Sequence, residues 1–96
     1  MKIVFAVKSG NKQKAEDVLK QDDEINRGSI TIRAASSLDI NEDCYFIILD
    51  ATHESVEKAK HLLKEIAELY KHPEKVIEKV EEQENSAIEG FGNVLG

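Results

Sequence analysis

The fold is decided by two stretches, Lys2-Ile-Val-Phe-Ala-Val-Lys8 and Cys44-Tyr-Phe-Ile-Ile-Leu-Asp50. In each stretch, both alternating sets of residues are apolar. The two sets in the first stretch are Ile3, Phe5, Val7 and Val4, Ala6. A strand with two apolar faces belongs in the middle of a sheet, where both faces are covered. The sequence therefore predicts two central strands.

A helix and a third strand are predicted between these two stretches. From Lys12 onward, apolar residues recur at helical spacing on a polar segment, and the acidic run Asp22-Asp23-Glu24 is expected to end this first helix. Residues Ser29 to Ala35 then alternate between apolar and polar side chains. This alternation is typical of an edge strand that has one face on the core.

Two helices are predicted after the second central strand. Thr52 is a suitable N-cap for a helix from His53 to about Tyr70, because apolar residues trace one stripe along it. Pro73 suits the first position of another helix through about Glu84, and a short strand over 75–80 is the alternative. The tail over 85–96 contains three glycines. A further strand and docking on a partner are both open for the tail.

This order of elements predicts an α/β (α+β) fold, namely a two-layer sandwich with a ferredoxin-like β-α-β-β-α core. We expect a single domain over 1–84, including the extra C-terminal helix, followed by the tail over 85–96. In such a fold the two core helices cover one face of the sheet, yet the central strands are apolar on the other face as well. The third helix, the tail or a second copy of the sheet must cover that face, so a homodimer or another protein partner is predicted.

Composition narrows the class of protein. The 96 residues carry a formal net charge of −6, which argues against DNA as a partner because affinity for nucleic acid depends on basic residues. Cys44 is the single cysteine, which excludes an internal disulfide and fits a reducing compartment. The apolar runs are too short for a signal peptide or a membrane span, so a cytoplasmic location without membrane association is expected.

The junction between the first strand and the first helix is the best candidate ligand site. A helix N-terminus offers free backbone N–H groups and a positive dipole, and nearby lysines add charge, so a phosphate or a carboxylate could bind there. The alternative is an ordinary turn whose lysines point into solvent. The candidate anion-binding residues are Lys8, Ser9, Gly10, Asn11, Lys12 and Lys14.

This segment resembles the start of the inosine-triphosphate pyrophosphatase family, which opens with a strand followed by Ser/Thr-x-Asn-x-x-Lys. Ser9, Asn11 and Lys14 match that pattern. The resemblance implies that Asn11 and Lys14 contact the phosphates of a nucleotide. The acidic, glycine-containing metal segment found downstream in that family has no counterpart in this sequence, so the hydrolytic activity is not carried over.

We interpret the other polar residues that could form a site as structural. The run Asp39-Ile-Asn-Glu-Asp43 imitates the start of a calcium loop, but Cys44 stands where such a loop needs glycine, so we interpret it as a polar turn. Cys44 itself is expected to be a structural thiol, because no neighbouring cation in the sequence would lower its pKa. Asp50 and Thr52 are interpreted as helix-capping residues rather than catalytic ones.

The three histidines follow one another at intervals of eight and eleven residues, unlike the spacing that places two metal ligands one turn apart. No cofactor motif and no catalytic arrangement can be argued from the sequence. We therefore predict a small, non-enzymatic binding or assembly module. The alternative is a phosphate- or nucleotide-binding protein that uses the turn at residues 8–14.

Overall fold

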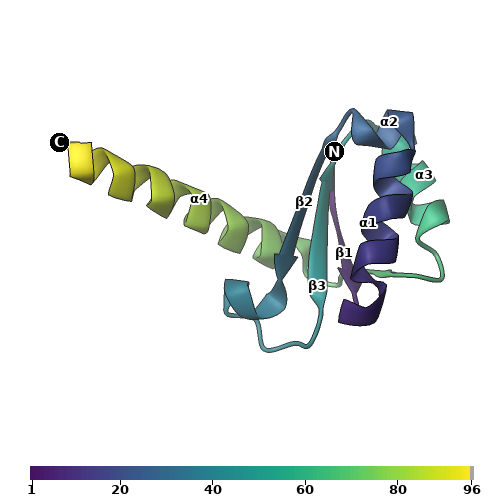
Figure 1. Cartoon of the computed structure of the whole chain (residues 1–96), viewed down its shortest axis with the longest axis horizontal. Coiled ribbons are helices and arrows are strands. Elements are labelled where there is room, and N and C mark those ends of the chain that lie inside the picture. The colour runs from purple at the N-terminus through teal and green to yellow at the C-terminus, as the bar shows by residue number, and fades with distance from the viewer. Residues whose placement is uncertain (96) are drawn as a thin grey trace.

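The computed structural model describes residues 1–95, with side chains described for residues 1–84. It contains one four-stranded sheet in the order β2-β3-β1-β4, and each neighbouring pair of strands is antiparallel (Figure 1). The strands are β1 (Lys2–Val7), β2 (Ser29–Ala34), β3 (Tyr45–Asp50) and β4 (Glu68–Leu69). The predicted α/β sandwich is confirmed, with β1 and β3 in the centre of the sheet and β2 at an edge.

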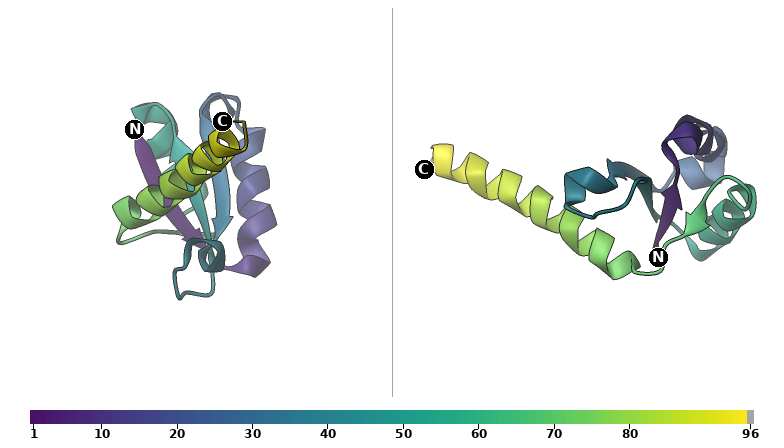
Figure 2. Two further views of the ribbon diagram at one scale, coloured as in Figure 1. Left: turned by 90° about the vertical axis from the view of Figure 1, so that its left-hand side faces the viewer. Right: turned by 90° about the horizontal axis from the view of Figure 1, so that it is seen from below.

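Three helices cover the first face of the sheet, and they are seen on one side of it in Figures 1 and 2. These are α1 (Lys12–Gln21), α2 (Asp23–Asn26) and α3 (His53–Leu62). One face of each central strand packs against them, and Ile30 and Ile32 of β2 lie on the same side. The first core consists of Phe5, Val7, Ala15, Leu19, Ile25, Ile47, Leu49, Val56, Ala59 and Leu63.

Thr52 and Asp22 cap the N-termini of α3 and α2 in this layer. The Thr52 hydroxyl accepts the backbone N–H of Ser55 at 3.2 Å, so the predicted cap of α3 is confirmed. Asp22 was expected only to help end α1. It is also the N-cap of α2, because its carboxylate accepts the N–H groups of Glu24 and Ile25.

The second face of the sheet is covered within the same chain. A 3₁₀ turn, η2 (Ala35–Leu38), and the first part of α4 (Pro73–Leu95) lie over it. The second core consists of Val4, Ala35, Leu38, Ile40, Phe46, Ile48, Val76 and Val80. The third helix, one of the three predicted ways to cover this face, is therefore found over it together with η2.

The prediction of a helix from His53 to about Tyr70 is wrong after Leu62, which is nearly the last half of the predicted span. Helix α3 ends at Leu62, and the chain turns before it forms β4 beside β1. The Tyr70 N–H donates to the Val4 carbonyl at 2.9 Å, which continues this pairing. The apolar stripe misled the prediction because two of its members, Leu62 and Leu69, are 37% and 52% exposed and do not face a core.

The C-terminal helix is longer than predicted. α4 continues from Pro73 to Leu95, so neither a strand over 75–80 nor a strand in the tail is formed within the described residues. Only Gly96 of the predicted tail lies outside the described backbone. Within residues 1–95, no helix combines the length and the apolar character that crossing a bilayer requires.

Candidate functional site

The turn between β1 and α1 is short and internally bonded. Ser9–Asn11 form a 3₁₀ turn, η1, in which the Asn11 N–H donates to the Lys8 carbonyl and the Lys12 N–H donates to the Ser9 carbonyl. These two amides are therefore already used by the turn. Gly10 has no positive φ, and a Cβ added to it would meet no atom within 4 Å. The turn consequently does not require glycine at this position.

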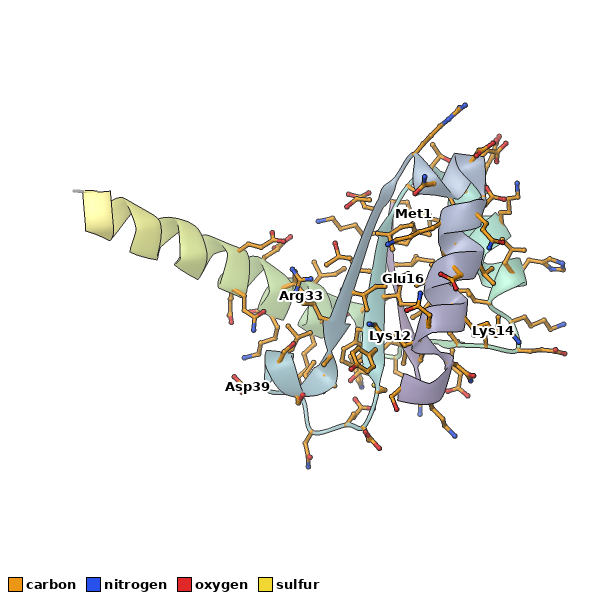
Figure 3. All side chains as sticks on the ribbon, in the orientation of Figure 1. Met1, Lys12, Lys14, Glu16, Arg33 and Asp39 are labelled. Atoms are coloured by element: carbon orange, nitrogen blue, oxygen red, sulfur yellow. The ribbon has the colours of Figure 1, made fainter. Side chains whose placement is uncertain are left out.

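The six candidate anion-binding residues do not converge on one point. Lys12 Nζ lies 5.1 Å from the centroid of the Tyr45 ring, which is cation–π geometry. Lys14 extends from the opposite side of α1 (Figure 3), as expected for residues two positions apart on a helix. Ser9 and Gly10 are exposed. Lys8 and Asn11 alone among the six line the adjacent cavity.

That cavity has a volume of about 430 Å³ and is formed by three segments that are distant in sequence. The end of β1 and the η1 turn form one wall, the residues before β3 form the second, and the turn between α3 and β4 forms the third. The lining residues are Ala6, Val7, Lys8, Asn11, Glu42, Asp43, Cys44, Lys64, Glu65, Ile66, Ala67 and Glu68. The second and third walls could not be predicted from the sequence, because no local pattern links them to the turn.

The charge of this lining is predominantly acidic. Lys8 and Lys64 are the cationic side chains, whereas the carboxylates come from Glu42, Asp43, Glu65 and Glu68. A multiply charged phosphate would therefore face a net negative lining, which costs electrostatic energy. The geometry does not strengthen the prediction of a phosphate or nucleotide site at residues 8–14.

Cys44 lines the same cavity as a half-buried free thiol. Partial burial raises its pKa above the ordinary value, and the neighbouring carboxylates of Glu42 and Asp43 raise it further. A thiol with a raised pKa is protonated at neutral pH and is a poor nucleophile. The cavity therefore lacks the thiolate that covalent catalysis by Cys44 would require.

A tyrosine joins the loop before β3 to the chain that leads into α4. The Tyr70 hydroxyl donates a hydrogen bond to the Glu42 carboxylate, and its ring packs against Phe46 with the centroids 4.6 Å apart. The bond to Glu42, together with partial burial, raises the pKa of Tyr70 to about 12. This group therefore remains a neutral hydrogen-bond donor at physiological pH.

The histidines and Asp50 are distributed rather than clustered. His53 and His61 lie near the two ends of α3, and His72 lies before α4 with its ring at 83° to that of Tyr70. Asp50 pairs with the N-terminal amine of Met1 at 3.5 Å. Across the described residues, no group of three or more His, Cys, Asp or Glu side chains is arranged to hold a metal ion.

The projecting half of α4, residues 85–95, is the second candidate site. α4 crosses the second face of the sheet, and at Glu84 it lies beside Ser29 and Thr31 of β2. The helix then runs well beyond the sheet (Figures 1 and 2), and the molecule measures 46 Å along its longest axis. The docked residues are Val76, Ile77 and Val80.

In the sequence, the apolar spacing of Val76, Ile77 and Val80 continues into the projecting half of α4. Apolar residues recur there at intervals of three and four, and residues at these intervals share one face of an α-helix. We call these residues the distal stripe, and they are Ala87, Ile88, Phe91, Val94 and Leu95. A helix over this segment was not predicted, because its glycines disfavour one.

Comparisons with known proteins add no further information about the site. No protein-family model, no curated protein and no solved structure matches the chain. The resemblance to the pyrophosphatase family therefore stays confined to Ser9, Asn11 and Lys14, and the candidate sites have to be judged on their geometry.

Proposed function

We propose that the chain is a non-enzymatic assembly module that associates with a second copy of itself through the projecting half of α4. The observation that carries this proposal is that α4 extends past the sheet whose face it covers (Figure 1). Residues among the first 84 form a core on each face of the sheet. The backbone of the projecting half runs away from the sheet (Figure 1), and we expect its distal stripe to meet a partner.

Charge favours a second copy as that partner. Residues 74–84 contain five glutamates and two lysines, whereas Glu89 is the single charged residue among residues 85–96. Two copies of the projecting half can therefore approach each other with little repulsion between like charges. A two-fold axis would place each distal stripe against its counterpart, as in the commonest oligomers.

The size of the projecting half sets the expected strength of the association. Eleven helical residues span about 16 Å. Two such segments bury less surface than the roughly 1,600 Å² of a standard interface. We therefore expect a reversible dimer whose population rises with protein concentration.

Sedimentation equilibrium of the full chain at several concentrations tests this proposal. The variant Ile88→Asp/Phe91→Asp places charges on the distal stripe and is expected to sediment as a monomer at concentrations where the wild type dimerises. The matched control Asn85→Asp/Asn93→Asp adds the same charge to the same half of α4 and is expected to keep the dimer. A wild type that is monomeric at all concentrations, or a variant that dimerises equally well, would overturn the proposal.

A further inference from the structure

The outer edge of β2 is the longest open edge of the sheet. β2 is the last strand on its side and has six residues, whereas β4 at the other edge has two. The Ala35 N–H donates to the Cys44 carbonyl at 3.0 Å, in register with the pairing of β2 and β3. Backbone groups alternate along a paired strand, so those of Ile30, Ile32 and Ala34 point away from β3.

Two side chains occupy carbonyl groups on this edge. Arg33 Nη1 donates to the Ile32 carbonyl at 3.0 Å, and Ser37 Oγ donates to the Ala34 carbonyl at 2.7 Å. Two of the three outward carbonyls therefore already have a hydrogen-bond donor from this chain. A charged side chain and occupied acceptors are both means by which natural proteins prevent an edge strand from pairing with another chain.

We infer that the outer edge of β2 is a pairing surface for a second copy of this chain, held closed by Arg33 and Ser37. The choice of a second copy rests on the proposed function, because α4 leaves the domain past β2 and would bring the copy to this side (Figure 1).

The residues of β2 are compatible with antiparallel pairing to β2 of a second copy. In an antiparallel register centred on Ile32, this residue lies opposite its own counterpart, and Thr31 lies opposite Arg33 of the copy. Residues directly opposite each other then belong to the same face of the sheet, so Ile30 and Ile32 extend the apolar first face across the junction. Arg33 opposes this pairing by its charge and by its bond to the Ile32 carbonyl.

The full-length variant Arg33→Ala/Ser37→Ala tests the inference. Opening the edge is expected to produce a dimer at concentrations at which the wild type sediments mainly as a monomer, so that the average mass there approaches twice that of one chain. The outward amides of Ile32 and Ala34, followed by NMR hydrogen exchange, are expected to become protected. The control Arg27→Ala/Ser36→Ala removes the same side chains from exposed positions away from the edge and is expected to leave mass and exchange unchanged.

A third substitution separates pairing at the edge from general instability. Ala34 has φ of −71°, which proline adopts readily, and its outward N–H takes no part in the pairing with β3. Adding Ala34→Pro to the double variant is expected to restore the mass of the wild type.

Each result of this design supports or overturns the inference. An unchanged mass and unchanged exchange in the double variant overturn it, and so does an equal increase in mass for the control. Combining the double variant with Ile88→Asp/Phe91→Asp separates the two proposals. A gain in mass in that background supports pairing at the edge whether or not the projecting half of α4 dimerises.

Discussion

The two faces of the sheet are built from the same central strands but are closed in different ways. The first face is covered by three helices that remain within the globular domain (Figure 2). Lys58 of α3 pairs with Asp22 at 2.7 Å and holds the pKa of that carboxyl below its usual range, so α2 and α3 are also joined at the surface.

The second face is covered by η2 and by one helix that continues past the sheet. Polar contacts hold the docked part of α4: Lys2 pairs with Glu81 at 3.5 Å, and the Gln83 amide donates to the Ser37 carbonyl. A cover that remains within the domain has a structural role. The other cover extends beyond the domain, and the proposed assembly rests on that difference.

The largest expected losses in stability come from truncating one large residue in each of the two cores. Phe5 and Phe46 lie on neighbouring strands, face opposite sides of the sheet, and are 2% and 0% exposed. Phe5→Ala and Phe46→Ala are each expected to lower the free energy of unfolding by about 3–5 kcal/mol, because each leaves a large cavity. Urea denaturation measures both losses. A loss below about 1 kcal/mol for Phe46→Ala would contradict the view that the second core belongs to the cooperative fold.

An intermediate effect is expected at the end of the sheet where β2 begins. A Cβ at Gly28 would lie 2.6 Å from the Asp50 carbonyl oxygen and 2.8 Å from the Ala51 Cβ. Gly28→Ala should therefore lower the free energy of unfolding by roughly 1–3 kcal/mol. Gly10→Ala is the control in open space and should change it by less than about 0.5 kcal/mol. Equal effects of the two substitutions would show that the close packing at Gly28 does not contribute to stability.

The smallest effect concerns the connection into α4. Tyr70→Phe keeps the ring against Phe46 but removes the bond to Glu42, and should cost about 0.5–1.5 kcal/mol at neutral pH. Tyr45→Phe removes the other tyrosine hydroxyl and serves as the control.

The pH dependence of this contribution follows from the raised pKa of Tyr70. That pKa is about 12 in the folded protein, above the value of about 10 for an unfolded chain. The contribution of the hydroxyl is therefore complete below about pH 10 and is lost as the pH rises toward 12. Denaturation at several pH values should show the difference between wild type and Tyr70→Phe narrowing above pH 10. A difference that stays constant with pH would contradict the assigned bond.

Much of the sheet could be predicted because its signals are local. Apolar residues on both faces identified β1 and β3 as central strands, and the alternation that places Ile30 and Ile32 on one face identified β2 as an edge strand. The end of α3 could not be predicted, because the apolar residues of 62–69 fit a helical stripe equally well. Only the pairing of β4 with β1 distinguishes the two conformations.

The candidate site was predicted only in part. Lys8 and Asn11 were identified from the turn, but the other walls of the cavity come from residues 42–44 and 64–68. Residues 8–14 were considered together because they are neighbours in sequence. The helical geometry of α1 then sends Lys12 and Lys14 in different directions.

The sequence by itself determined that two strands are buried on both faces, since side-chain alternation is a property of each strand alone. It also required that something cover the second face. Only the tertiary structure decided that α4 is that cover, that α3 stops at Leu62, and that an edge of the sheet carries Arg33 and Ser37 over its carbonyl groups. Those outcomes depend on contacts between segments that are distant in sequence, and no local pattern of residues encodes such contacts.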